Sequence, residues 1–287
     1  MNPKLSIITI NRNNAAGLRR TIESVVSQTY TDFEYIIIDG ASTDESVEVI
    51  KEFENLKIWE FENSETLTIG SRLQWVSEPD KGIYNAMNKG ILKAKGEYLL
   101  MLNSGDWLVD SQTLDNVFKN NYNQDILYGN IIWTINSEIA FKTEFNYKLH
   151  FKNFVHASLA HQATFIKRKL HDTIGLYDEN QKIVSDWSFF LLSLFKHNCT
   201  HFHLNLYIAI SERDGISCLP QNQELIDEER RTFLKHNFNL QYEEYSENID
   251  IENELIKYRN FYEKSYKTKI KRFLKRNKLL KKNNTEN

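Results

Sequence analysis

Cysteine is scarce in this chain, and long apolar runs are missing. The 287 residues include two cysteines, Cys199 and Cys218, which form no close pair and show no spacing typical of a zinc site. This pattern excludes a disulfide framework and fits a reducing cytoplasm. No uninterrupted apolar stretch reaches the roughly 18 residues of a membrane-spanning helix, and the first apolar run is too short for a signal peptide. The sequence therefore predicts a cytoplasmic protein without a transmembrane span.

Two glycine motifs that bind phosphates are missing as well. Neither GxGxxG, typical of dinucleotide-binding folds, nor GxxxxGK[ST], typical of P-loops, occurs in the chain. The charge of a substrate phosphate must then be neutralised in another way. A divalent metal held by a carboxylate such as Asp106 is the simplest candidate, because hard cations prefer oxygen ligands and bridge protein to phosphate.

Charge is distributed unevenly along the chain. Residues 264–287 contain ten of the 36 basic residues and one of the 39 acidic ones, which leaves residues 1–263 with a net charge of -12. The acidic body argues against a nucleic-acid partner. The apolar residues of the tail recur at spacings compatible with a basic amphipathic helix, which can lie on an anionic membrane surface. A solvated, frayed C-terminus is the alternative interpretation.

The first third of the chain alternates between strand and helix patterns. Short apolar runs at 4–10, 33–39, 73–78 and 97–103 are typical of buried strands, and residues 15–28, 44–53 and 83–94 carry apolar side chains at helical spacing. This alternation predicts an α/β fold with a mostly parallel sheet flanked by helices on both faces.

The pattern changes after Asp106. Residues 111–121 fit a helix, 125–145 an antiparallel hairpin, 186–197 a helix and 200–210 a strand, with two charged helices after Pro220. We therefore predict one catalytic or binding domain over residues 1–220, made of a first half (1–106) and a second half (107–220). Residues 221–287 would form a C-terminal helical extension that ends in the basic tail.

Polar segments follow the ends of the four predicted parallel strands, at residues 9–12, 39–44, 77–82 and 103–106. Ligands of open parallel sheets bind at this edge, where loops and helix N-termini gather. Three of the segments carry an acid at or just after the strand end. A single such acid usually caps a helix or forms a turn. Three on one sheet edge indicate a binding site.

Two stretches resemble a known family. IITINRNNAAGLRRTIESVVSQTYTDFEYIIIDGASTDES is similar to the start of an inverting family-two glycosyltransferase of the GT-A fold, and VSEPDKGIYNAMNKGILKAKGEYLLMLNSGDW is similar to its continuation in the subgroup that builds bacterial surface polysaccharides. The resemblance covers roughly residues 4–215, where motif order and spacing agree together. It implies a Rossmann-like GT-A sheet that binds a nucleotide-sugar donor.

The resemblance implies roles for the strand-end residues on the donor side. Asp39 would read the nucleotide base, Thr9 and Asn11 would line the base pocket, and Asp80 and Lys81 would contact base and ribose. Asn103 would also belong to the donor-binding residues.

It also implies a metal site and a catalytic base. The family's D-x-D metal motif corresponds to residues 103–106, where Asn103 replaces an acid, so a weaker site for Mn²⁺ or Mg²⁺ would depend mainly on Asp106. Asp186, with Ser185 in the first position of the family's acid pair, would be the general base that deprotonates the acceptor hydroxyl. A helix-capping role for Asp186 is the alternative.

Other residues would lie on the acceptor or diphosphate side. His161 and Gln162 resemble a polar pair that borders the acceptor, Trp187 could stack on a sugar ring, and Arg213 lies in a segment that resembles a loop closing over the diphosphate. For His161 a partly buried structural role is the alternative, and for Arg213 a surface turn.

The function that this resemblance implies is transfer of one sugar, with inversion, from a nucleotide-diphosphate sugar to a glycan or lipid-linked acceptor. A UDP-sugar is the favoured donor, and the basic tail would hold the enzyme on the inner face of the membrane. The Q-x-x-R-W element of processive synthases is absent. Two alternatives stay open. Asn103, Asn85 and Ser185 are compatible with a non-catalytic nucleotide-sugar-binding module, whereas a nucleotidyltransferase should have a Gly- and Arg-rich loop where this chain has TINRNNA.

Overall fold

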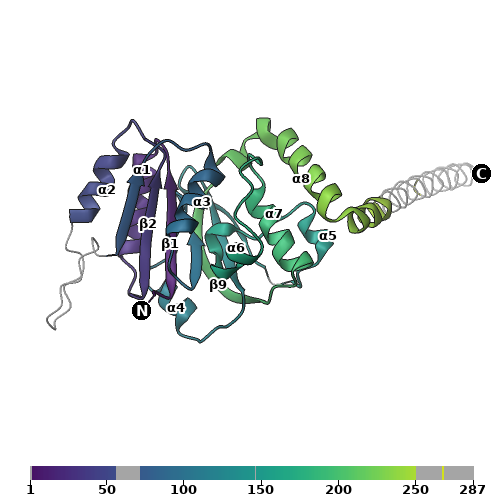
Figure 1. Ribbon diagram of the computed structural model, residues 1–287, viewed down its shortest axis with the longest axis horizontal. Helices are drawn as coiled ribbons and strands as arrows, with labels where there is room; N and C mark the ends of the chain where they lie inside the picture. The colour runs from purple at the N-terminus through teal and green to yellow at the C-terminus, as the bar shows by residue number, and fades with distance from the viewer. Residues whose placement is uncertain (1, 56–71, 146, 250–266, 268–287) are drawn as a thin grey trace, which may run out of the picture. The chain divides into compact units, whose positions relative to one another are not determined.

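The computed structural model describes residues 2–55, 72–145, 147–249 and 267. The chain divides into two compact units, Met1–Arg230 and Arg231–Asn287. The first unit contains a nine-stranded mixed sheet in the order β3-β2-β1-β4-β8-β6-β9-β5, with β7 paired to β6. Figure 1 shows this sheet with helices packed along it.

The N-terminal half has the predicted strand and helix alternation. Its strands β3, β2, β1 and β4 are all parallel to their neighbours. The elements are β1 (Leu5–Asn11), α1 (Ala15–Val26), β2 (Phe33–Asp39), α2 (Ser46–Asn55), β3 (Leu73–Ser77), α3 (Ile83–Lys93) and β4 (Tyr98–Met101).

The second half adds antiparallel pairs, so the sheet as a whole is mixed. Strand β8 pairs antiparallel with β4 and β6, the predicted hairpin is β6 with β7, and β9 runs parallel to β6. The elements are β5 (Trp107–Leu108), α4 (Thr113–Phe118), β6 (Ile126–Ile135), β7 (Glu138–Thr143), α5 (Phe151–Phe154), β8 (Thr164–Lys167), α6 (Lys169–Thr173), α7 (Ser185–Leu191), β9 (His201–Glu212) and α8 (Gln223–Asn237). The helix expected at 186–197 is α7 followed by a π-helical turn over Leu192–Lys196.

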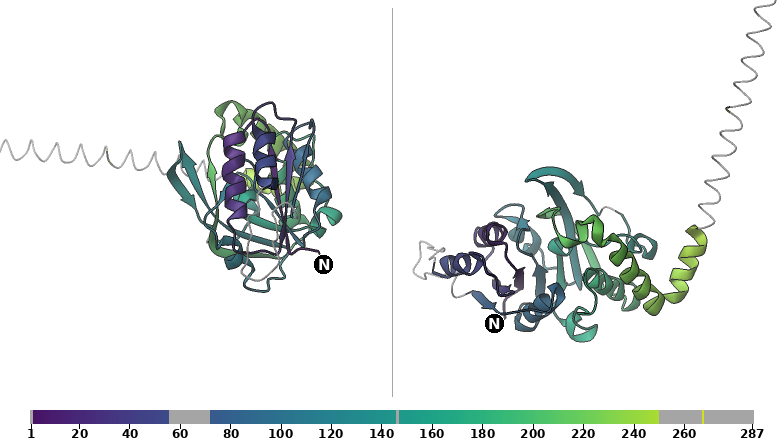
Figure 2. Two further views of the ribbon diagram at one scale, coloured as in Figure 1. Left: turned by 90° about the vertical axis from the view of Figure 1, so that its left-hand side faces the viewer. Right: turned by 90° about the horizontal axis from the view of Figure 1, so that it is seen from above.

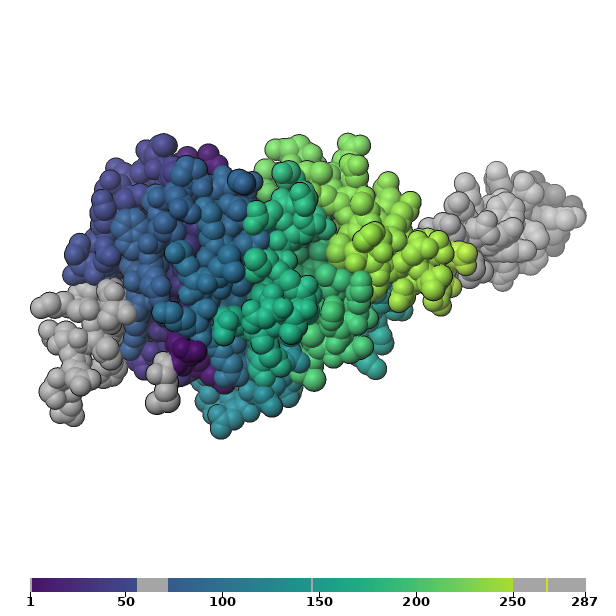
Figure 3. Space-filling view, viewed as in Figure 1, coloured from purple at the N-terminus to yellow at the C-terminus, as the bar shows by residue number. Residues whose placement is uncertain are grey.

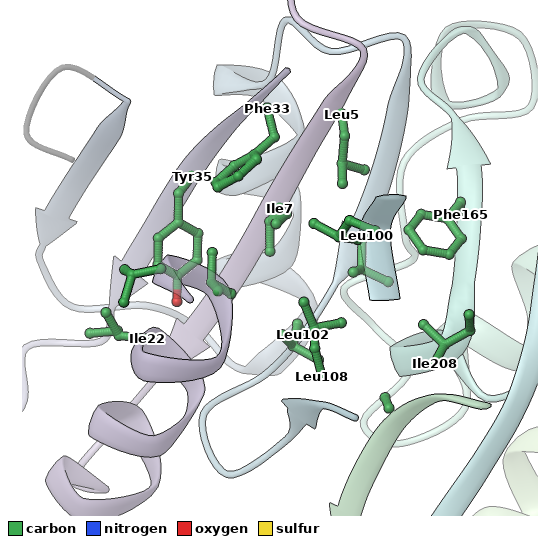
Figure 4. Packing of buried hydrophobic residues seen from close by; sticks show 14 of the residues in the cluster. Leu5, Ile7, Ile22, Phe33, Tyr35, Leu100, Leu102, Leu108, Phe165 and Ile208 are labelled. Atoms are coloured by element: carbon green, nitrogen blue, oxygen red, sulfur yellow. The ribbon is translucent and has the colours of Figure 1, made fainter. Parts of the chain in front are cut away.

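The central strands are covered on both faces, which explains their continuous apolar sequences. Every residue of β1 and β2 is buried. On one face Ile7 and Tyr35 pack with Ile22 of α1 (Figure 4), and α1 and α2 lie side by side there (Figure 2, left). On the other face α3 contacts β1 so closely that a Cβ on Gly90 would stand 2.4 Å from Ile8 Cγ2. Burial of both faces is what central parallel strands require.

One side chain fixes the beginnings of two helices beside the strand ends. The Asp44 carboxylate accepts hydrogen bonds from the backbone N–H groups of Ala15 (2.9 Å) and Ser46 (3.1 Å). A carboxylate at helix N-termini satisfies free N–H groups and complements the helix dipole. The loops that follow β1 and β2 are therefore held together at the sheet edge.

The start of α8 is tied to the first unit. The Glu229 carboxylate accepts hydrogen bonds from the backbone N–H groups of Lys182 (2.5 Å) and Ile183 (3.1 Å), just before α7. The first unit therefore includes the first half of α8, whereas the domain predicted from the sequence ends at residue 220. In the space-filling view the two halves of the first unit form one continuous surface (Figure 3).

The second unit is helical where it is described. Residues 231–237 complete α8, and residues 239–249 form a second helical stretch, as the charged sequence after Pro220 predicts. The basic tail at 264–287 lies outside the described residues except for Lys267. None of the described helices combines the length and the apolar character needed to cross a membrane.

Candidate active site

Three of the four polar strand-end segments, those after β1, β3 and β4, line one cavity of about 1010 Å³ in the first unit. Its walls come from the ends of β1 and β4, the start of α3, the β6–β7 hairpin, residues 156–162, the start of α7, residues 211–218 and the start of α8. Sequence segments from both halves thus meet at the carboxyl edge of the parallel strands, where ligands of such sheets bind. Of the twelve residues predicted for the site, those that line the cavity are Asn11, Asp80, Asn103, Asp106, His161, Gln162, Asp186, Trp187 and Arg213.

Asp39 is fully buried beneath the donor end of this cavity. Its carboxylate accepts hydrogen bonds from Asn11 Nδ2 (2.8 Å), Ser42 Oγ (2.5 Å), Ser42 N (2.9 Å) and Ser77 Oγ (2.6 Å). Burial favours the protonated acid, but these hydrogen bonds outweigh it and keep the pKa of Asp39 below its usual value. Since a carboxylate has about four acceptor positions, these four hydrogen bonds occupy Asp39 and hold the surrounding side chains in place; its contact with a nucleotide base stays a prediction.

Asn11 has the free oxygen at this end. Its Nδ2 donates to Asp39, whereas its Oδ1 is buried and has no hydrogen-bond partner among the described residues. A buried acceptor without a partner costs free energy and therefore indicates a ligand contact. Thr9 is also fully buried, but its hydroxyl donates to Leu102 O (2.6 Å) and contacts Tyr35 Oη (3.0 Å), so it lies away from the cavity.

Asp80 and Lys81 differ in position. Asp80 lines the cavity, and its carboxylate approaches the backbone of Gly40, where a Cβ would stand 2.3 Å from Asp80 Oδ2. Glycine at position 40 is what permits this approach. Lys81 is exposed and does not line the cavity; its backbone N–H donates to Asn85 Oδ1 (3.1 Å).

Asp106 and Asn103 supply oxygen atoms suited to a hard cation. Asp106 is 7% exposed, and burial raises its pKa to about 6, although nearby His161 and hydrogen bonds with Ser211 and Gln162 oppose the rise. Asn103 Oδ1 is buried without a partner among the described residues. One carboxylate and one free amide oxygen fit a Mn²⁺ or Mg²⁺ ion whose other ligands are diphosphate oxygens and water. No group of three His, Cys, Asp or Glu side chains in the described ranges could hold a metal by itself.

Asp186, at the start of α7, is held by two side chains. Tyr84 Oη donates to Asp186 Oδ1 (2.9 Å), and His161 Nδ1 lies 3.1 Å from Asp186 Oδ2. Burial would raise the pKa of Asp186, but the hydrogen bonds and the charge of His161 keep it below the usual value. Burial acts in the opposite sense on His161, yet its contact with Asp186 raises the pKa of His161. Asp186 is therefore ionised and able to accept a proton.

His161 also connects Asn103, which follows β4, with Asp186 at the start of α7. Its Nε2 lies 3.3 Å from Asn103 Nδ2, so the ring bridges Asn103 and Asp186. When His161 is neutral and donates from Nδ1, its Nε2 accepts from Asn103 Nδ2 and leaves Asn103 Oδ1 free, whereas a protonated His161 has N–H groups at both ring nitrogens and does not accept this hydrogen bond. Sequence reasoning placed His161 on the acceptor side but missed this bridge and the contact from Tyr84.

The remaining predicted residues have mainly structural contacts. Gln162 donates to Ser211 Oγ (3.3 Å), and Trp187, 1% exposed, donates from Nε1 to Phe154 O (2.6 Å) and forms the floor of the cavity. Arg213 is exposed at the rim, and its guanidinium lies 5.2 Å from the centroid of the Phe141 ring. Ser185 Oγ accepts from Asp178 N (2.6 Å), which explains a hydroxyl in the place of an acid.

Comparisons with known proteins agree with this geometry. The model of the family "Glycosyl transferase family 2" matches residues 6–123. The PGL/p-HBAD biosynthesis glycosyltransferase of Mycobacterium tuberculosis is 32% identical over 191 residues, which are 65% of this chain and 68% of that protein. An uncharacterized glycosyltransferase of the same species is 39% identical over 105 residues, 36% of this chain and 34% of that protein.

Solved structures show the same fold at lower identity. S. aureus TarS (residues 1–349) superposes with a TM-score of 0.56 and 16% identity; the match covers 73% of this chain and 60% of that one. The mannosyltransferase PcManGT from Pyrobaculum calidifontis gives a TM-score of 0.51 and 16% identity over 74% of this chain and 57% of that one. The chain thus belongs to glycosyltransferase family 2, has a GT-A type fold, and is a glycosyltransferase.

Proposed function

We propose that the protein transfers one sugar from a nucleotide-diphosphate sugar to an acceptor hydroxyl, with inversion at the anomeric carbon. The observation that carries this proposal is the position of Asp106 and Asp186 on one cavity, joined through Asn103 and His161. One acid is placed to hold a cation near the leaving group, and the other is placed to act on the acceptor.

A UDP-sugar is the favoured donor, and a divalent metal is the proposed cofactor. TarS has been solved with UDP and with UDP-GlcNAc, and PcManGT with GDP-Man and Mn²⁺. In this chain Asn11 Oδ1 would accept a hydrogen bond from the base, and Asp80 would contact base or ribose. Asp106 and Asn103 would hold Mn²⁺ or Mg²⁺, which stabilises the negative charge of the departing nucleoside diphosphate when it is bound.

Asp186 would remove the proton of the acceptor hydroxyl as its oxygen attacks the anomeric carbon. The new glycosidic bond forms while the bond to the diphosphate breaks, and the proton passes to the carboxylate. His161 and Tyr84 hold this carboxylate in position, and its lowered pKa keeps it ionised. No covalent intermediate is needed, because the base acts on the side opposite the leaving group.

The acceptor is proposed to be a glycan or a lipid-linked saccharide of a bacterial surface polysaccharide. This rests on the sequence resemblance and on relatives such as the PGL/p-HBAD biosynthesis enzyme. The protein would act in the cytoplasm, at the inner face of the membrane if the basic tail docks there.

Release of nucleoside diphosphate from UDP-, GDP- and dTDP-sugars, measured with Mn²⁺ or Mg²⁺ and with EDTA, tests the proposal. We expect metal-dependent release from one donor in the wild type. Asp106→Asn should abolish release and weaken metal-dependent donor binding. Asp186→Asn should abolish transfer to an acceptor and leave donor binding intact.

Three outcomes would contradict the proposal. If calorimetry detects no binding of any nucleotide, the cavity is not a donor site. If Asp186→Asn transfers sugar at the wild-type rate, another group is the base. Nucleotide-sugar binding by the wild type with no turnover of any donor, in the presence of a broad acceptor panel, would favour a binding module instead.

A further inference from the structure

Arg230 lies beside the proposed base and was not among the predicted site residues. It lines the cavity from the middle of α8, and its guanidinium carbon lies 5.1 Å from the centroid of the Trp187 ring. One terminal nitrogen donates to His156 O (3.0 Å). The backbone contacts of Glu229 fix this turn of α8 against the segment that leads into α7. Arg230 is therefore held in place next to Asp186.

The charge of Arg230 is partly buried and has no ion-pair partner. Within residues 2–55, 72–145, 147–249 and 267, the ion pairs involve other cations. Its Nε is buried without a hydrogen-bond partner in the same part of the chain. Burial lowers the pKa of Arg230, and the nearby charges of Asp186 and Asp227 oppose this without forming a contact. Burying an uncompensated cation costs free energy, so the arrangement is suited to an incoming anion.

The location assigns this anion to the acceptor rather than to the donor. Arg230 packs on Trp187, the residue that follows Asp186, whereas the oxygen atoms suited to the metal and diphosphate belong to Asn103 and Asp106 after β4. In an inverting displacement the base and the acceptor lie on the side opposite the leaving group. A group beside Asp186 therefore meets the acceptor.

We infer that Arg230 recognises an oxyanion, a phosphate or a carboxylate, carried by the acceptor close to the hydroxyl that is glycosylated. The inference rests on the proposed function, because it takes Asp186 as the base. Guanidinium groups suit both anions, since their planar fork of N–H donors matches two oxygen atoms. The wall of the cavity that comes from the β6–β7 hairpin and the residues after it is aromatic, with Trp133, Phe141 and Phe145. These rings can contact the uncharged part of the acceptor.

Binding to the full-length protein saturated with UDP and Mn²⁺ tests the inference. The probes are glucose 1-phosphate, octyl phosphate and glucuronate, with glucose as the neutral reference, and calorimetry measures each dissociation constant. We expect at least one anion to bind and glucose to bind more weakly. Arg230→Gln should weaken binding of that anion by about tenfold or more, as expected for the loss of a charge-assisted hydrogen bond.

Two further variants serve as controls. Arg231→Gln, a change at the exposed neighbouring arginine, should leave binding unchanged. Arg230→Lys keeps the charge and should retain part of the affinity, which separates a lost contact from a misfolded protein. Octyl phosphate binding would indicate a lipid-phosphate acceptor, and glucuronate binding an acidic sugar.

Several results would overturn the inference. One is that no anion binds to the wild type. Another is that an anion binds to the wild type without UDP but not to the UDP-saturated protein, which would place the anion in the donor phosphate site. A third is that Arg230→Gln and Arg231→Gln behave alike. The rate of donor hydrolysis without acceptor tests the proposed function independently of anion binding. If the wild type hydrolyses its donor and Arg230→Gln does so at the same rate, the proposed function stands whatever the anion result.

Discussion

At the residue scale, three carboxylates differ because of their surroundings: Asp39 ends β2, Asp106 follows β4, and Asp186 lies at the start of α7. Hydrogen bonds from Asn11, Ser42 and Ser77 keep the pKa of Asp39 low, and His161 and Tyr84 do so for Asp186. Asp106 has weaker compensation for its burial, so its pKa is raised to about 6. These surroundings agree with the hydrogen bonds by which Asp39 holds its loop and with the proposed roles of Asp186 as proton acceptor and Asp106 as cation ligand.

Replacing His161 tests whether it positions the base. In His161→Ala, Asp186 keeps Tyr84 but loses its contact at Oδ2, so its orientation is less well defined. We expect kcat for transfer to fall roughly 10- to 100-fold, because small misplacements of a catalytic group cost about this much. The KM for the donor should change less than kcat. Steady-state kinetics measure both values, and an unchanged kcat would show that the contact has no role in the reaction.

His171 provides a test of stability against pH. It is 5% exposed, its ring stacks on Phe189 with centroids 4.4 Å apart, and burial lowers its pKa from 6.5 to about 4. The unfolded chain therefore binds more protons than the folded chain between these pH values, and stability falls as the pH decreases through this range. We expect a loss on the order of 2 kcal/mol between pH 7 and pH 5 from this residue.

Urea unfolding at both pH values measures the effect. His171→Phe keeps an aromatic ring against Phe189 and should show a smaller loss of stability at pH 5 than the wild type. His197→Gln, a change at an exposed histidine, is the surface reference variant. Equal pH dependence in His171→Phe and the wild type would show that His171 is protonated in the folded state.

At the scale of elements, the strand and helix pattern was predictable because periodicity reflects burial. Strands β1 and β2 are apolar at every position since helices cover both of their faces. The hairpin of β6 and β7 follows from its β-branched and aromatic residues. Periodicity could not predict that β9 pairs parallel to β6, while β8 on the other side of β6 and β5 on the other side of β9 pair antiparallel. Strands that are far apart in the sequence leave no local pattern that identifies their pairing partners.

The turn after β2 gives a prediction at this scale. In Gly40→Ala the new Cβ would stand 2.3 Å from Asp80 Oδ2 and 3.5 Å from Arg12 Cβ. The end of the Asp80 side chain can move away, so the free energy of unfolding should change by less than about 1 kcal/mol. Affinity for the donor nucleotide should fall about tenfold, because Asp80 is displaced from the cavity wall.

Calorimetric titration with UDP and thermal unfolding distinguish these effects. Asp80→Ala is the reference variant and should lose donor affinity to a similar extent. If Gly40→Ala binds the nucleotide as tightly as the wild type, the close approach of Asp80 to Gly40 is not needed for donor binding.

At the scale of the whole molecule, the uneven charge predicts salt-dependent membrane binding by the tail. Each Lys or Arg near an anionic surface contributes about 1 kcal/mol, and ten such residues lie in 264–287. We expect the full chain to sediment with phosphatidylglycerol vesicles but not with phosphatidylcholine vesicles, and to dissociate as salt is raised. Lys→Gln changes at the tail lysines should abolish sedimentation and leave donor hydrolysis unchanged. Binding that salt does not weaken would contradict an electrostatic tail.

The sequence by itself determined the α/β alternation, the family and the sheet edge that carries the site. Local periodicity and motif spacing are properties of contiguous residues, so Asp106 and Asp186 could be identified as candidates. Only the tertiary structure decided how they are connected. The bridge from Asn103 through His161 to Asp186 joins segments 58 and 25 residues apart.

The same reason explains the hydrogen bonds of Asp39 and Thr9, which the sequence did not predict, and the residue that it missed. Asp39 and Thr9 follow the right strands, but their hydrogen bonds to Ser77, Tyr35 and Leu102 come from neighbouring strands and occupy them. Arg230 stands in a charged helix that looks like solvent-exposed surface in the sequence. Its place beside Asp186 depends on how α8 packs against α7, because burial and contact are set by the packing of distant segments rather than by the local pattern.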